Sequence, residues 1–121
     1  MSFNISFNGN LDVNPLDIII LNESDIDIYP EMIIKKVGNG NVKITNINTS
    51  QVFEINNMAD DETVYIDNDK EIINPYLGER FDYKYLRLIK GVNTLRTDGA
   101  CHIRFRYRHK YLPQTGGEIY D

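Results

Sequence analysis

The chain has 121 residues, with 13 Lys and Arg against 18 Asp and Glu and a formal net charge of −5 at pH 7. This length predicts one domain with one hydrophobic core, and contents of 41% hydrophobic and 26% charged residues are ordinary for a globular fold. The longest apolar run, residues 16–21, is interrupted by Asp17 and is too short to cross a membrane, and the amino terminus lacks the pattern of a signal peptide. We therefore expect no membrane partner.

The predicted elements are strands along the whole chain. Residues 1–15 are expected to be a loosely ordered lead-in with one short strand at Phe3–Phe7. Further strand candidates, in chain order, are Asp17–Leu21, Met32–Val37, Val42–Ile47, Gln51–Asn56, Thr63–Asp67, Glu71–Ile73, Phe81–Leu88, Asn93–Thr97 and Cys101–Tyr111. Many short strands with frequent turns indicate an all-β antiparallel sandwich with at most one short helix. We expect a single domain over residues 16–112, followed by a flexible tail over 113–121.

Two segments carry specific local predictions. Asn39-Gly40 suits the positive φ angles of a type I′ turn, which predicts a hairpin between its flanking strands. Phe81, Tyr83 and Tyr85 alternate as on a strand, whereas Leu77, Phe81, Tyr85 and Ile89 would line a helix. We favour the strand because aromatic residues are common there.

The last strand candidate alternates most clearly. Its apolar positions are Cys101, Ile103, Phe105, Tyr107 and Tyr111, and its basic or titratable positions are His102, Arg104, Arg106, Arg108 and Lys110. Period-two alternation predicts one face in the core and one outside. Residues 80–121 hold 9 Lys and Arg against 4 Asp and Glu, a net charge of +5, whereas residues 1–79 are at −10. The basic face is therefore a candidate partner-docking surface.

Three interpretations of this basic face remain open. First, acids within the domain, such as Asp25 and Asp27, pair with it, each cross-strand pair contributing about 0.2–1 kcal/mol. Second, another protein docks on it. Third, nucleic acid binds there, with Phe81, Tyr83 and Tyr85 stacking bases; a sequence pI near 5.0 opposes this, so we expect no nucleic-acid partner.

Catalytic and metal-binding patterns are absent from the sequence. Three acidic clusters could offer oxygen ligands to Ca²⁺: Asp25-Ile26-Asp27, Asp60-Asp61-Glu62 and Asp67-Asn68-Asp69. None has the spacing of a helical calcium loop, and the third is better explained as a turn. The single Cys101 excludes an internal disulfide, fits a reducing compartment, and is expected to be a buried apolar residue. The sequence predicts no enzyme activity, no metal and no cofactor.

Tyrosines bear on carbohydrate binding, because sugars stack on aromatic rings. The chain has eight tyrosines and no tryptophan. Tyr65, Tyr83, Tyr85 and Tyr107 fall at alternating strand positions, where packing in the core is the commoner role.

The order of turns and strands from residue 38 onward carries a family resemblance. The segments concerned are Asn41–Asn46, Phe53–Ile55, Glu62–Asp67, Leu88–Leu95 (read as Leu-x-x-Gly-x-Asn-x-Leu) and Ile103–Arg108. Over about residues 30–112 the chain resembles the carboxyl-terminal domain of distal tail proteins from siphophages and the prophages derived from them. Within it, Gly91 suits a left-handed turn, and the Asn93 side chain suits a bond to the backbone where the chain re-enters a strand.

This resemblance implies a galectin-like, jelly-roll-like sandwich outside a hexameric ring at the tail tip. It implies a non-enzymatic virion component, made in the bacterial host cytoplasm, that docks other tail, baseplate or receptor-binding proteins. The alternative is a carbohydrate-binding module that contacts host cell-wall polysaccharide directly. The isolated chain is expected to be a monomer, and to join a hexameric ring only as part of a full-length distal tail protein.

Overall fold

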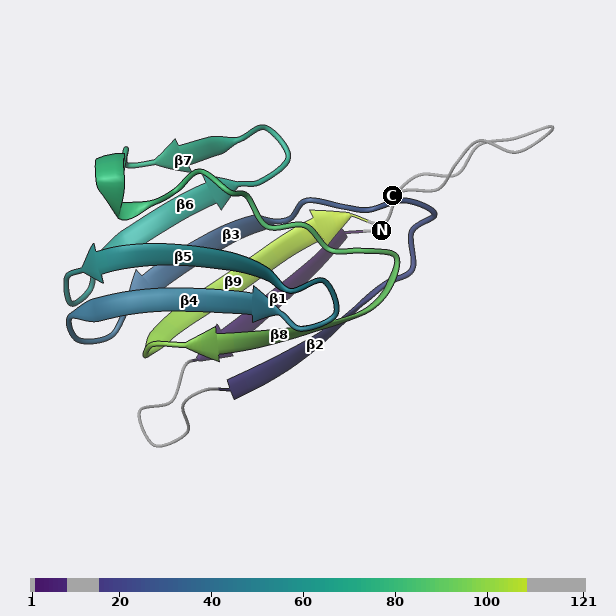
Figure 1. The fold of residues 1–121 in the computed structure, drawn as a ribbon, viewed down its shortest axis with the longest axis horizontal. Coiled ribbons are helices and arrows are strands. Elements are labelled where there is room, and N and C mark those ends of the chain that lie inside the picture. Colours follow the sequence, from purple (N-terminus) through teal and green to yellow (C-terminus); the bar gives the residue numbers. More distant parts are fainter. Residues whose placement is uncertain (1, 9–15, 109–121) are drawn as a thin grey trace.

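The computed structural model describes residues 2–8 and 16–108, which form two antiparallel sheets packed face to face (Figure 1). The strands are β1 (Ser2–Asn8), β2 (Leu16–Asn22), β3 (Glu31–Lys36), β4 (Gly40–Asn46), β5 (Gln51–Met58), β6 (Thr63–Asp67), β7 (Ile72–Asn74), β8 (Gly91–Asp98) and β9 (Cys101–Arg108). The five-stranded sheet has the order β1-β9-β3-β6-β7, and the four-stranded sheet has the order β2-β8-β4-β5. The only helical segment among the described residues is the 3₁₀ turn η1 (Gly78–Arg80). The predicted all-β antiparallel sandwich is confirmed.

The core lies between the two sheets and is filled by every second residue of the strands. Ile34 of β3, Ile44 of β4, Phe53 of β5 and Phe105 of β9 are all fully buried. Their chain neighbours point outward, so the period-two pattern of the sequence sorts each strand into a core face and an outer face.

Residues 2–8 belong to the five-stranded sheet. The strand expected at Phe3–Phe7 is present as β1, which pairs antiparallel with β9 over seven positions, from Ser2 opposite Arg108 to Asn8 opposite His102. This part of the expected lead-in is therefore an edge strand. At the other end, β9 is described to Arg108, so the predicted strand end at Tyr111 lies outside the described residues, as does the expected tail over 113–121.

The hairpin predicted at Asn39-Gly40 is wrong. Strand β3 lies in the five-stranded sheet and β4 in the four-stranded one, so this turn crosses between sheets. Asn39 does not have the positive φ that a type I′ turn needs at both central residues. Three hydrogen bonds hold the chain at this crossing. Val37 N donates to Ala100 O at 3.0 Å, and the buried Lys36 ammonium donates to Val37 O and Ala100 O at 2.9 and 3.0 Å.

The strand predicted at Phe81–Leu88 is also wrong. This segment forms no ladder: it has two isolated bridges, Phe81 with Ile55 and Leu88 with Ile28, and Tyr83 between them has a φ of 62°. Between the bridges, side-chain amides take the place of a partner strand. Gln51 Nε2 donates to Tyr85 O at 2.6 Å, and Gln51 Oε1 accepts from Arg87 N at 3.0 Å.

The asparagine Asn68 continues this support. Its Oδ1 accepts from Leu86 N at 2.8 Å, while its Nδ2 donates to Pro30 O at 2.6 Å. A buried peptide group needs a partner but does not need it to come from a strand. The segment 81–90 therefore lies alongside the sandwich without forming a strand of either sheet.

Candidate functional site

The outer face of β9 presents the predicted basic residues. His102, Arg104 and Arg106 are exposed, while Cys101, Ile103, Phe105 and Tyr107 are buried, so the two faces lie as the sequence pattern predicts. We call His102, Arg104 and Arg106 the basic row. Arg108 ends β9, although its side chain lies outside the described part, and Lys110 lies outside the described residues altogether.

Strand β3 supplies the neighbours of the basic row. In the antiparallel register Lys35 lies opposite His102, Ile33 opposite Arg104 and Glu31 opposite Arg106. The Glu31 Oε2 and Arg106 Nε atoms are 3.9 Å apart, in side chains that are 33% and 60% exposed. Such an exposed pair contributes little to folding stability, about 0–1 kcal/mol. Lys35 extends the positive charge onto β3.

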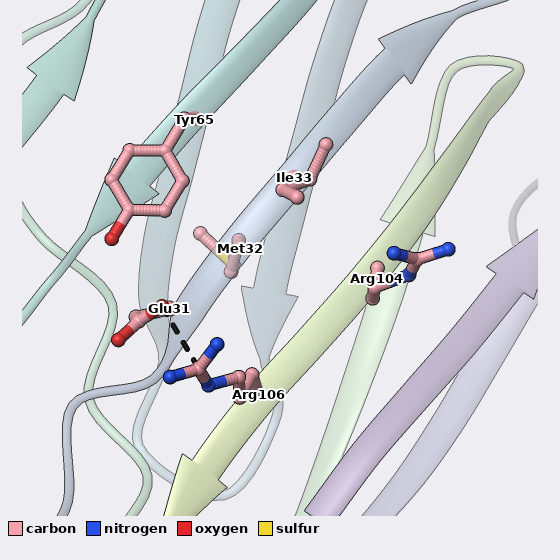
Figure 2. Close-up of a pocket in the computed structure, with 6 residues that line it drawn as sticks. All are labelled: Glu31, Met32, Ile33, Tyr65, Arg104 and Arg106. Carbon is pink, nitrogen blue, oxygen red and sulfur yellow. Dashed lines mark ion pairs between the residues drawn. The ribbon is translucent and has the colours of Figure 1, made fainter.

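A shallow hollow of about 160 Å³ lies beside the basic row, between β9, β3 and β6 (Figure 2). Its lining residues are Glu31, Met32, Ile33, Tyr65, Arg104 and Arg106. Arg106 reaches toward Glu31, whereas Arg104 extends away from it, toward the other side of β9 (Figure 2). Burial, then the neighbouring Glu31 and Asp67 carboxylates, raise the pKa of Tyr65, so its phenol stays protonated at neutral pH. The hollow thus offers one guanidinium group, that of Arg106, together with the phenol of Tyr65 and the carboxylate of Glu31. The guanidinium of Arg104 lies outside it, on the other side of β9.

Glu31 pairs with the basic row, and it is not one of the acids named from the sequence. Asp27 pairs with Arg87 at 3.6 Å, and neither Asp25 nor Asp27 lies on a strand next to β9. The acid opposite the row is Glu31, which sequence reasoning missed together with Lys35 and Tyr65. Lys35 lies at an outward position of the strand predicted at Met32–Val37, whereas Glu31 is the residue before that predicted strand and the first residue of β3. The sequence did not reveal the strand order, which places β3 beside β9.

The acidic clusters are used within the fold. Asp67 Oδ1 accepts from Asp69 N and Lys70 N, both at 3.0 Å, which forms the predicted turn between β6 and β7. Asp60 Oδ1 accepts from Gly38 N at 2.7 Å, and Glu62 accepts two hydrogen bonds from Arg80 at 3.0 and 2.8 Å. Among the described residues, no group of three or more His, Cys, Asp or Glu is arranged to hold a metal ion.

Two further predicted positions have clear local roles. Gly91 has a φ of 92°, and Asn93 Oδ1 accepts from Ile89 N at 2.8 Å while its Nδ2 donates to Ile89 O and Gly91 O at 2.9 and 3.1 Å. These bonds shape the turn into β8.

Burial raises the pKa of the Cys101 thiol to about 11, so it is an inert thiol at neutral pH. In the described part of the chain, no helix is long and apolar enough to cross a membrane.

Comparison with known proteins decides the family. A family model described as "Phage tail C-terminal domain" matches residues 2–107. The chain belongs to this family. A curated relative, the SPbeta prophage-derived uncharacterized protein YomH of Bacillus subtilis (strain 168), is 28% identical over 102 residues, covering 79% of this chain and 40% of the relative. The phage tail domain therefore spans well under half of that relative's length. No solved structure matches this chain.

The predicted resemblance to a carboxyl-terminal domain of a phage tail protein is thus confirmed at the level of the family. Membership in a phage tail family makes the domain part of a virion tail component. The finer assignments, to the distal tail protein, to the tail tip and to a galectin-like sandwich, go beyond this family description.

Proposed function

We propose that this domain is a non-enzymatic module of a phage or prophage tail tip or baseplate, belonging to a distal tail protein, and that it docks other tail or receptor-binding proteins. One observation carries the proposal: an exposed row of basic side chains crosses the outer face of one sheet in a chain whose net charge is −5. The family supplies the setting, since its members are tail domains.

The expected partner presents acidic side chains on an extended or sheet-like surface. Alternate residues on a strand lie about 6.8 Å apart, which matches the spacing of acids on a second strand. Opposite charges across an interface mainly raise the association rate and fix the orientation of the partner. In the hollow beside the row, one carboxylate of that partner would compete with Glu31 for Arg106, and a second acid would meet Arg104 on the other side of β9.

Charge reversal tests this proposal. The double variant Arg104→Glu/Arg106→Glu is compared with Lys43→Glu/Lys70→Glu, which changes the net charge equally at exposed sites away from the basic row. Each is mixed with purified tail proteins encoded beside this gene, and association is measured by surface plasmon resonance at two salt concentrations. We expect the wild-type domain to bind at least one of these proteins, with an affinity that falls at high salt. We expect the arginine variant to lose this binding and the lysine variant to keep it. Equal binding by both variants, or no bound tail protein, would contradict the proposal.

The assembly state is a related proposal. We propose that the isolated domain is a monomer and that a hexameric ring requires the rest of a distal tail protein. The surface that argues most strongly against a monomer is the outer face of the four-stranded sheet. Three apolar side chains lie there: Ile19 and Leu21 on the edge strand β2 and Val92 on β8, which are 70%, 48% and 51% exposed. Sedimentation at micromolar concentration checks this. A stable dimer or hexamer abolished by Ile19→Ser would contradict it and identify this face as the contact.

The alternative function is direct contact with host cell-wall polysaccharide. The feature that supports this alternative is a pair of exposed tyrosine rings, which lie after β7 and away from the basic row.

A further inference from the structure

Two tyrosine rings lie together on the surface between β7 and the segment 81–90. The Tyr76 side chain is 79% exposed and that of Tyr83 is 39% exposed. Their ring centroids are 6.2 Å apart with an angle of 27° between the planes, so the rings are stacked. This corner of the sandwich, at the end of β7 beside η1, lies apart from the basic row on β9 (Figure 1).

A chain of ring contacts fixes this pair to the core. The Tyr83 ring packs edge-on against Phe81, with centroids 5.1 Å apart, and the buried Phe81 ring packs on Phe53 at 5.1 Å. The Tyr83 hydroxyl donates to Gly78 O at 3.2 Å. The Tyr76 ring lies over Gly78, since a Cβ placed there would be 3.8 Å from its Cε2 atom. The two exposed rings therefore have fixed positions.

The backbone at Tyr83 has an unusual conformation. Tyr83 has a φ of 62°, in the left-handed region that a bulky side chain rarely adopts. Such a conformation costs on the order of 1–3 kcal/mol and is concentrated at binding and catalytic sites. Here the strained residue presents its ring to solvent beside Tyr76, so the strain accompanies a surface feature.

We propose that Tyr76 and Tyr83 form a stacking platform for the pyranose ring of a neutral sugar. A pyranose with equatorial hydroxyls has an apolar face of C–H bonds that covers an aromatic ring, and a rim of hydroxyls that seeks polar partners. The exposed side chains of Glu79, Asp82 and Lys84 stand near the two rings in the chain and carry both signs of charge. Because their charges are of both signs, they do not form a site for an anionic ligand, and they are the candidate donors and acceptors for the hydroxyls of a neutral sugar.

The size of the platform favours a sugar over a protein. A specific protein interface buries roughly 800 Å² on each partner, whereas this site offers two rings bordered by charged residues. Tyrosine is suited to such contacts because a ring with two rotatable bonds loses little conformational entropy on binding. This sugar site is independent of the docking role proposed for the basic row.

The test uses the full chain and three soluble probes: the methyl β-glycosides of glucose, galactose and N-acetylglucosamine. Binding is followed by saturation-transfer difference NMR, with an array of neutral and acidic glycans to widen the search. The main variant is Tyr76→Ala, which removes an exposed ring. Tyr29→Ala is the matched control, because Tyr29 is 41% exposed and lies in the β2–β3 connection. Tyr76→Phe keeps the ring, and Tyr83→Gly removes the second ring while tolerating the positive φ.

We expect saturable binding of at least one neutral glycan. Affinity should fall roughly tenfold in Tyr76→Ala and in Tyr83→Gly, as expected for the loss of one ring contact, and stay within about twofold in Tyr76→Phe and Tyr29→Ala. Three results would overturn the proposal: no glycan bound by the wild-type chain, binding that survives Tyr76→Ala, or binding of acidic glycans alone that depends on Arg104. Loss of a protein partner in Tyr76→Ala without any sugar binding would also overturn it and make the platform a protein contact.

Discussion

Strand β9 and the segment 81–90 have similar sequence patterns and different structures. Both alternate, with Ile103, Phe105 and Tyr107 on one face of β9, and Phe81, Tyr83 and Tyr85 in the segment. On β9 the backbone pairs with β1 on one side and β3 on the other. In the segment the backbone meets the side chains of Gln51, Asn68 and Asn93 instead.

The comparison teaches that alternation alone decides neither where the peptide groups bond nor which side chains are buried: on β9 the alternating residues are buried, whereas in the segment Phe81 is buried and Tyr83 is exposed. A partner strand can be replaced by amide side chains, because each carries both a donor and an acceptor. Gln51 bonds the carbonyl of Tyr85 and the N–H of Arg87, which is the pair of bonds that one residue of a neighbouring strand would make. Four predictions test the two halves of this comparison.

The largest effect is expected on the buried face of β9. Phe105 is fully buried in the core, so Phe105→Ala should lower the free energy of unfolding by about 3–5 kcal/mol through lost burial and a cavity. Urea denaturation followed by circular dichroism measures this. A loss below 1 kcal/mol would mean that this face of β9 does not contribute to the core.

The amide support of the segment comes next. Asn68→Ala removes the partner of Leu86 N and one of the two donors to Pro30 O, which keeps the backbone N–H of residue 68. Leaving the buried Leu86 N–H unpaired costs about 1–3 kcal/mol. Asn56→Ala, at a half-buried asparagine of β5, is the control. We also expect faster hydrogen exchange at the Leu86 amide while the β9 amides stay protected. Unchanged exchange at Leu86 would show that packing alone holds the segment.

The exposed face of β9 should be more tolerant. The double variant Arg104→Glu/Arg106→Glu should cost no more than about 2 kcal/mol, because it alters exposed charges and one 3.9 Å ion pair. The same urea denaturation used for Phe105→Ala gives the comparison. If the arginine variant is the more destabilising, the basic row supports the fold and is not an open docking surface.

The smallest effect concerns the ion pair where the segment begins. Two hydrogen bonds from Arg80 hold the pKa of the Glu62 carboxyl below its usual range. A lowered folded-state pKa means that this pair stabilises the fold at neutral pH and that its contribution is lost as the pH falls through that pKa.

Glu62→Gln should therefore lower stability at pH 7 by less than about 1 kcal/mol, since both side chains are partly exposed. The difference between wild type and variant should shrink as the pH falls through the acidic range. Thermal denaturation from pH 7 to pH 3 measures this. A difference that grows toward acid would reverse the assigned role of Glu62.

Local patterns in the sequence were enough for the fold class and for most elements. The strand expected at Thr63–Asp67 is β6 with the same bounds, and the Asp67-Asn68-Asp69 turn connects β6 to β7 as expected. The faces of β9 were also predictable, because period two along one strand leaves only two orientations. The candidate site was predicted in part. Alternation identified the basic row, whereas the strand order, which only the structure gives, places Glu31 and Tyr65 beside it.

The sequence by itself determined that this protein is a β-sandwich with a basic outer face on its last strand, because alternation and turn residues act within a few neighbouring positions. Only the tertiary structure decided three other features: that Asn39-Gly40 crosses between sheets, that residues 81–90 bond to amide side chains, and that Tyr76 stacks on Tyr83. Each depends on contacts between residues whose proximity is set by strand order or by a turn in the backbone. Such contacts leave no periodic signal in the sequence.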